Sequence, residues 1–263
     1  MAFIEKEHVK AEFSAYTAPY DIKDEKIALK IEHTYRVADL CEVIARNEGL
    51  TELDANLAWL IGMLHDIGRF EQVRQYGTFS DADSVDHAEL GADILFDEKK
   101  GIIRDFVRAD IDDDVIEAAI RNHSRYRIDE KLEERQKLFA RILRDADKID
   151  ILKVNVDFPL EAIYNTTKEI IRRADVTPEV MDSFYEHHAT LRKLKKTPVD
   201  HVVGHISLVF ELEFEISLQI VMKQGYLDRL LDFESDNPST RKCFARLNEE
   251  MNSFLAMHGI FRH

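Results

Sequence analysis

Cysteine, glycine, proline and long hydrophobic runs are all scarce in this sequence. Its 263 residues include 2 Cys, 9 Gly and 5 Pro. Cys41 and Cys243 lie far apart and outside any CxxC pair, so we expect reduced thiols and neither a disulfide framework nor a cysteine metal site. The shortage of glycine and proline disfavours a fold of many strands and turns.

We also expect neither a secretory targeting segment nor a membrane-spanning segment. The most apolar stretch, residues 202–221, is interrupted by three glutamates and a histidine, which excludes a membrane span there. The first 13 residues carry acids and a histidine where a secretory signal needs a basic start and an apolar run. We therefore expect a cytoplasmic protein without membrane contact.

The charge is strongly one-sided, with 51 Asp and Glu against 36 Lys and Arg, a formal net charge of -15. Binding to a nucleic-acid polymer depends on Lys and Arg that neutralise phosphates, so we do not expect it. A small anionic phosphate-containing substrate remains compatible with this charge if a metal supplies local positive charge. A homo-oligomer also remains open.

The sequence does show helical periodicity. Apolar residues recur every three or four positions through most of its length. We therefore expect an all-α bundle with additional C-terminal helices packed on the same body. The expected helices cover about residues 3–15, 24–47, 53–66, 86–97, 112–123, 131–153, 157–174, 178–195, 199–223 and 238–257. Thr51 and the pair Thr177-Pro178 are expected to start helices, and Asn47 with Gly49 to end one.

The stretch from Arg69 to Val85 interrupts this periodicity. It contains a cluster of glycine, serine, threonine and aspartate, which is typical of a loop between two helices. Loops longer than about 12 residues in compact domains are often functional, so we expect a lid or specificity element here.

Histidines and aspartates at helix ends or on helix faces form an ordered series along the chain. The members that we consider as metal ligands are His33, His65, Asp66, His87, His123 and Asp147. Imidazoles and carboxylates from several helices can together hold one or two divalent ions. We expect the apolar run before His65 to bury its helix and Gly68 to end that helix. A buried Asp66 then needs a positive partner, which a cation provides.

The order of these residues resembles the HD superfamily of metal-dependent phosphohydrolases. The similarity lies in the histidine of IEHTYRV, the HDIG after an apolar helix and the late DADKID, over roughly residues 28–155. It implies an HD-domain helical bundle in which the first metal's ligands are His33, His65, Asp66 and Asp147. Residues 1–27 would then be an N-terminal extension and residues 156–263 a C-terminal helical region. We expect all three parts to form one compact body.

The segment HAELGADIL is similar to a segment of the binuclear HD-GYP phosphodiesterases and their relatives. That likeness implies a second metal on His87 and His123, with Asp66 as the bridge. The sequence departs from the pattern because it has no GYP segment and a single His123 where the relatives have consecutive histidines. A site with one metal therefore stays open.

The resemblance also implies the chemistry, which is attack of a metal-activated water on a phosphomonoester or phosphodiester. We assign catalytic roles to Asp66, Arg69 and Asp150, the last as an acid that orients a ligand. Arg69 stands where relatives commonly carry a substrate-contacting lysine, and Arg74 and Arg125 are further candidates for binding phosphate. The metal could be Mn, Fe, Co, Ni or Zn.

Two other functions fit the same residues. Di-iron oxygenases related to myo-inositol oxygenase share this ligand order on the same scaffold, and iron content with oxygen consumption would reveal one. A nucleotide-binding regulator without turnover is the other, and nucleotide binding without product would reveal it.

Overall fold

The computed structural model describes residues 4–110, 112–159 and 166–262. Within these ranges the regular structure consists of helices without any strand, so the predicted all-α class is confirmed. No helix in these ranges is long and apolar enough to cross a membrane. The chain divides into two compact units, Met1–Asp147 and Lys148–His263. The three-part division and the single body expected from the sequence stay predictions.

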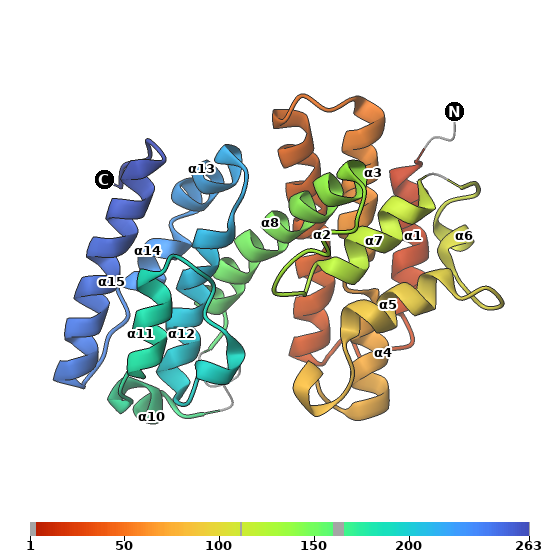
Figure 1. Cartoon of the computed structure of the whole chain (residues 1–263). Helices are drawn as coiled ribbons and strands as arrows, with labels where there is room; N and C mark the ends of the chain where they lie inside the picture. Colours follow the sequence, from red (N-terminus) through yellow and green to blue (C-terminus); the bar gives the residue numbers. More distant parts are fainter. Residues whose placement is uncertain (1–3, 111, 160–165, 263) are drawn as a thin grey trace. The chain divides into compact units, whose positions relative to one another are not determined.

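The first unit contains the helices that carry the candidate site (Figure 1). They are α1 (Lys6–Thr17), α2 (Glu25–Asn47), α3 (Glu52–Leu64), α4 (Ile67–Tyr76), the 3-10 turn η1 (Asp81–Asp83), α5 (His87–Phe96), α6 (Ile103–Phe106), α7 (Asp113–Asn122) and the first part of α8 (Glu134–Asp157). The division between the units falls within α8.

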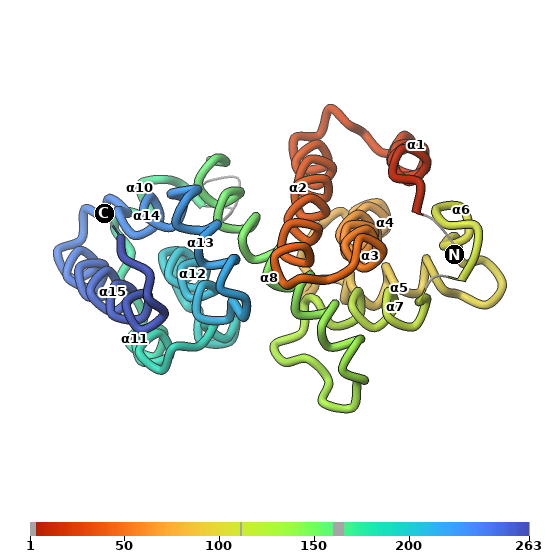
Figure 2. The backbone as a smooth tube through the Cα atoms, turned by 90° about the horizontal axis from the view of Figure 1, so that it is seen from above, coloured from red at the N-terminus to blue at the C-terminus, as the bar shows by residue number. Residues whose placement is uncertain are grey.

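Helix α3 forms the centre of the first unit, and Figures 1 and 2 both show it beside α2. All of its residues from Leu57 to Leu64 are buried, because its apolar residues cover the whole circumference. At Gly62 a Cβ atom would lie 2.5 Å from the Cα atom of Ala38 on α2, so glycine permits the close approach of the two helices. The C-terminal end of α3 therefore delivers the next residues into the core.

Several predicted helix ends are confirmed. The Thr51 hydroxyl accepts a hydrogen bond from the Asp54 amide at 3.2 Å and caps α3. Helix α2 ends at Asn47, and Gly49 follows with a φ of 72°. Each of these residues satisfies or redirects the backbone where a helix leaves its end groups unpaired.

The loop expected from Arg69 to Val85 is wrong over residues 69–76, which are helical, and confirmed over residues 77–85, which hold a 3-10 turn at Asp81–Asp83 and no α-helix. Helix α3 stops at Leu64, and a new helix, α4, runs from Ile67 to Tyr76. Gly68 lies inside α4 and does not end a helix. A Cβ atom on Gly68 would come within 2.3 Å of the backbone oxygen of His87, so this glycine lets α4 pack closely against α5.

The second unit holds the remaining helices, which Figure 1 shows in green to blue. They are the second part of α8, α10 (Lys168–Arg173), α11 (Pro178–Tyr185), η2 (Arg192–Leu194), α12 (Pro198–Ile206), η3 (Ser207–Glu211), α13 (Glu215–Gln224), α14 (Tyr226–Leu231) and α15 (Pro238–Met257). Part of the helix expected over 157–174 lies outside the described residues.

Two single helices expected in the second unit, over 178–195 and 199–223, are each interrupted. The second one changes to a 3-10 turn at Ser207, whose buried hydroxyl donates to the Gly204 oxygen at 2.8 Å and accepts from the Thr190 amide at 3.0 Å. This contact joins Thr190, which follows the end of α11 at Tyr185, to the place where α12 gives way to the 3-10 turn.

Candidate metal centre

The six predicted ligands all belong to the first unit, but they come from different helices. His33 projects from α2, and His65 with Asp66 forms the turn between α3 and α4. His87 is the first residue of α5 and His123 follows α7. Asp147 is in α8, at the last position of the unit.

The first group of side chains contains His33, His65, Asp66 and Asp147. Oδ2 of Asp66 lies 3.6 Å from Nε2 of His33 and 3.5 Å from Nε2 of His65. Oδ1 of Asp147 lies 3.1 Å and 3.9 Å from the same two nitrogens. Two imidazole nitrogens and two carboxylate oxygens therefore converge on one place.

A second group lies on the other side of Asp66. Its Oδ1 atom is 3.4 Å from Nε2 of His87 and 3.9 Å from Nε2 of His123. The two imidazole nitrogens are 3.0 Å apart. The carboxylate of Asp66 therefore directs Oδ2 to the first group and Oδ1 to the second, the arrangement that a bridging carboxylate requires.

The protonation states suit a cation. Burial lowers the pKa of His65, and it lowers the pKa of His87 and of His123 to about 4, so these rings are neutral near pH 7. Burial opposes ionisation of Asp66, but the charge of Lys30 and the other positive groups around the carboxyl together outweigh burial and hold its pKa well below the usual value. Burial likewise opposes ionisation of Asp147, and the hydrogen bond with His33 lowers its pKa. The centre thus offers neutral imidazoles and anionic carboxylates.

The lone pairs of three imidazoles point toward the centre. Nδ1 of His65 donates to the Gly62 oxygen and Nδ1 of His123 to the Ile120 oxygen, each at 2.7 Å. Nδ1 of His87 faces a carboxylate oxygen of Asp81 at 2.8 Å. With the hydrogens on Nδ1, every Nε2 of this trio presents a lone pair.

These lone pairs lack a protein donor. Nε2 of His65 is buried and has no hydrogen-bond partner among the described residues. Nε2 of His87 and of His123 meet at 3.0 Å with no hydrogen between them. Such an arrangement is unfavourable by itself, since buried acceptors need a partner. Two ligands about 2.1 Å from one ion lie about 3 Å apart at a right angle, so a divalent ion fits this pair.

Lys30 lies at the centre, and the sequence did not lead us to predict it there. Its Nζ atom lies 2.6 Å from Oδ2 of Asp66, and its side chain is 24% exposed. It precedes His33 by three residues, so both project from the same face of α2. That spacing was the available signal. Lys30 supplies one positive charge at the Asp66 carboxylate.

Arg69 lies beside the centre, but its guanidinium is engaged. Nη1 donates to Oε1 of Gln72 at 2.9 Å, to the Phe79 oxygen at 2.6 Å and to Oδ1 of Asp81 at 2.7 Å. Nε lies 3.6 Å from Oδ1 of Asp66, without a hydrogen bond. Asp81 and Gln72 were not singled out from the sequence, although Asp81 lies within the stretch that we read as a functional loop.

The other three predicted functional residues lie in different surroundings. Arg74 pairs with Glu71 at 2.6 Å and Arg125 pairs with Glu89 at 2.6 Å. Asp150 is buried on α8 and belongs to the second unit, three positions beyond Asp147. Their roles in substrate binding and catalysis stay predictions.

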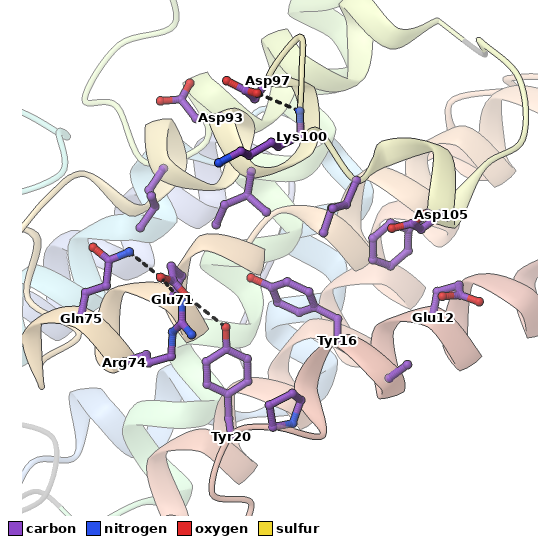
Figure 3. Close-up of a pocket in the computed structure, with 16 residues that line it drawn as sticks. Glu12, Tyr16, Tyr20, Glu71, Arg74, Gln75, Asp93, Asp97, Lys100 and Asp105 are labelled. Atoms are coloured by element: carbon purple, nitrogen blue, oxygen red, sulfur yellow. Dashed lines mark hydrogen bonds and ion pairs between the residues drawn. The ribbon is translucent and has the colours of Figure 1, made fainter.

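A separate cleft of about 850 Å³ opens in the first unit among α1, α4, α5 and α6 (Figure 3). Tyr16 and Tyr20 project into it, and none of the six predicted ligands lines it. Its charged lining residues are Glu12, Glu71, Asp93, Asp97, Asp105, Arg74 and Lys100. Acids outnumber bases, so the cleft does not suit a phosphate anion.

Comparison with known families gives one match. Residues 31–152 match the family model described as the HD domain, and all six predicted ligands fall within that range. The match confirms the resemblance predicted from the motif order. The search of curated proteins and the search of solved structures gave no significant match.

Proposed function

Because the chain contains an HD domain at residues 31–152, the domain of a metal-dependent hydrolase superfamily, we propose that it is a metal-dependent phosphohydrolase. One observation carries the proposal. The two oxygens of the buried Asp66 carboxylate face two separate pairs of imidazole nitrogens, His33 with His65 and His87 with His123. Hydrolysis of a phosphomonoester or phosphodiester by an activated water is the reaction that such a pair of positions supports best.

The donor set divides into two positions. His33, His65 and Asp147 would hold the first ion together with Oδ2 of Asp66. His87 and His123 would hold the second together with Oδ1. Nitrogen and carboxylate oxygen donors suit Mn, Fe, Co, Ni or Zn. When bound, the metal would supply an activated water and polarise the phosphoryl oxygens.

The protein's own contribution to substrate binding includes Lys30. Its ammonium lies at Asp66, is partly exposed, and can meet a phosphate oxygen that approaches the first position. Arg69 holds its neighbouring loop through Nη1, so we assign it to the shape of the site more than to a bidentate phosphate contact. The acidic chain as a whole does not attract anions, so binding of a phosphate-containing substrate would depend on these local charges.

The test combines metal analysis with hydrolysis of bis-p-nitrophenyl phosphate and p-nitrophenyl phosphate in added Mn²⁺. The variants are His65→Ala and His87→Ala, with His188→Ala as control because that histidine is exposed and lies in the second unit. We expect two ions in the wild type, fewer in both site variants, and hydrolysis lost in both. The control should behave as the wild type.

Other outcomes contradict the proposal in distinct ways. Iron with oxygen consumption and no phosphate release would identify a di-iron oxygenase. Nucleotide binding without product would identify a silent regulator. Absence of metal after reconstitution would refute the metal centre itself. One ion that His87→Ala leaves in place would refute the two-ion form.

A further inference from the structure

We infer that Asp81 is a positioning residue that sets the orientation and tautomer of His87 and so makes the second metal position depend on the loop between α4 and α5. The inference rests on the proposed function, because it concerns the same centre. Its test, however, includes a measurement on the metal-free protein that does not depend on activity.

The carboxylate of Asp81 is shared between the loop and the centre. Oδ2 lies 2.8 Å from Nδ1 of His87. Oδ1 accepts from Nη1 of Arg69 at 2.7 Å and from Nε2 of Gln72 at 2.8 Å. Since donors occupy both oxygens, the carboxylate is not an open metal ligand. Asp86, another acid near this ring, accepts from the amide of Ala88 and caps α5.

His87 needs such a partner because of its place in the fold. The other two rings that expose a lone pair, His65 and His123, follow a helix, and each donates Nδ1–H to the carbonyl three residues earlier. His87 is the first residue of its helix. No helical carbonyl precedes it, so an acceptor must come from elsewhere. Asp81 provides that acceptor from the loop.

The acceptor decides which ring nitrogen is available. An ionised carboxylate has no hydrogen to give, so the hydrogen of the neutral ring sits on Nδ1, and Nε2 is left with its lone pair. That nitrogen then faces Oδ1 of Asp66 at 3.4 Å. With the opposite tautomer a hydrogen on Nε2 would block a metal. A carboxylate behind a ligating histidine also fixes the ring orientation and raises its basicity.

The position of Asp81 is itself held by α4. Nε2 of Gln72, a fully buried residue, lies within 2.9 Å of Ser84 Oγ and of the Val85 oxygen as well as near Asp81. Arg69 reaches the Phe79 oxygen at 2.6 Å. The loop is therefore fastened at several points to the helix that starts directly after Asp66.

The first test measures Mn²⁺ binding by calorimetry and metal analysis in Asp81→Asn and Asp81→Ala. Asp83→Asn is the matched control, since Asp83 is an exposed acid in the same loop. In Asp81→Asn the side chain keeps one accepting oxygen and gains an NH2 group. That NH2 group must face either Nδ1 of His87 or the donors of Arg69 and Gln72, so one of these hydrogen bonds is lost. We expect the second ion to bind about 10- to 100-fold more weakly in both Asp81 variants, with the first ion and the control unchanged.

The second test reads the tautomer of His87 directly. Long-range ¹H–¹⁵N spectra of the metal-free protein, assigned with His87→Ala, should show Nδ1 protonated and Nε2 unprotonated in the wild type. Asp81→Ala should give a mixture of tautomers, and Asp81→Glu should restore part of the wild-type signal. A loss of packing alone would not redistribute the hydrogen in this way, so the spectrum separates positioning from general stability.

Two results would overturn the inference. One is wild-type affinity for both ions in Asp81→Asn and Asp81→Ala. The other is a wild-type His87 with its hydrogen on Nε2. If the wild type binds a single ion that His87→Ala leaves in place, the two-ion form of the proposed function fails instead, and the spectrum still decides the role of Asp81.

Discussion

The ammonium of Lys30 lies 2.6 Å from Oδ2 of Asp66, the oxygen that also faces His33 and His65. Lys30 thus stands on the side of Asp66 where the first ion would bind. In the absence of metal it compensates part of the buried negative charge. Once a divalent ion is present, two cations share one carboxylate, and they repel each other.

We therefore expect Lys30→Met to tighten Mn²⁺ binding by about tenfold, or about 1.4 kcal/mol, because methionine keeps much of the stem and removes the charge. Inorganic phosphate should inhibit this variant less strongly, since a phosphate-facing cation is lost. Calorimetry and inhibition kinetics measure the two effects. Lys26→Met, at an exposed position of the same helix, is the control. Weaker Mn²⁺ binding in Lys30→Met would contradict the expected repulsion.

The metal-free protein should lose stability in mild acid. The pKa of His87 and of His123 falls from 6.5 to about 4 on burial, so the unfolded chain binds protons between these pH values that the native state does not. The free energy of unfolding should then be unaffected by these groups above pH 6.5 and decrease as the pH falls to about 4. Urea unfolding at a series of pH values measures this slope.

His87→Gln is the matched variant for the pH series, because glutamine is polar and does not titrate. It should show a smaller slope between pH 4 and pH 6.5 than the wild type. An equal slope in both proteins would assign the acid sensitivity to other groups. Carboxylates with lowered pKa, such as Asp66, contribute at lower pH, where their stabilisation is lost.

A methyl group at Gly68 should separate α4 from α5. The added Cβ would lie 2.3 Å from the His87 oxygen and 2.6 Å from the Gly91 nitrogen. Backbone atoms cannot move aside cheaply, so we expect Gly68→Ala to lose about 1–3 kcal/mol of stability. Gly91→Ala, whose nearest contact is 3.1 Å, should lose less. Thermal unfolding compares the two, and equal losses would contradict the close approach at Gly68.

The stability of the second unit should depend on Asp200. This buried carboxylate accepts from the amide and hydroxyl of Thr177, at 2.8 and 2.6 Å, and from the amides of Lys196 and Thr197. Asp200→Ala leaves four donors without this acceptor, and we expect a loss of about 2–4 kcal/mol in urea unfolding. Asp182→Ala, at an exposed position, is the control. Metal content should be the same in all three proteins.

Local signals in the sequence predicted the start or end of a helix correctly where a single residue determines it. Thr51 caps α3, Pro178 starts α11, and Asn47 with Gly49 ends α2, as expected. These features depend on backbone groups within a few residues, so no tertiary knowledge is needed. The motif order likewise predicted which histidines and aspartates gather in the first unit, although their role as metal ligands stays a prediction.

Features that depend on contacts between residues far apart in the chain could not be predicted from the sequence. Gly68 was expected to end a helix, but it lies where α4 packs closely against α5. Predicting that role requires knowing which helix packs there. The expected helix 199–223 breaks where Ser207 meets Thr190. The partnership of Asp81 with His87 joins a loop to a helix start. Spacing alone does not reveal such pairs.

Helix α4 connects the two groups of side chains in the centre. It begins directly after Asp66, and its Arg69 and Gln72 fasten the loop that supports His87. If a second ion binds at His87 and His123 as proposed, ordering of that loop would raise its affinity, and the ion would order the loop by the same factor. Occupancy of a buried ion would thereby be reported at the surface, as resistance of the loop to proteases.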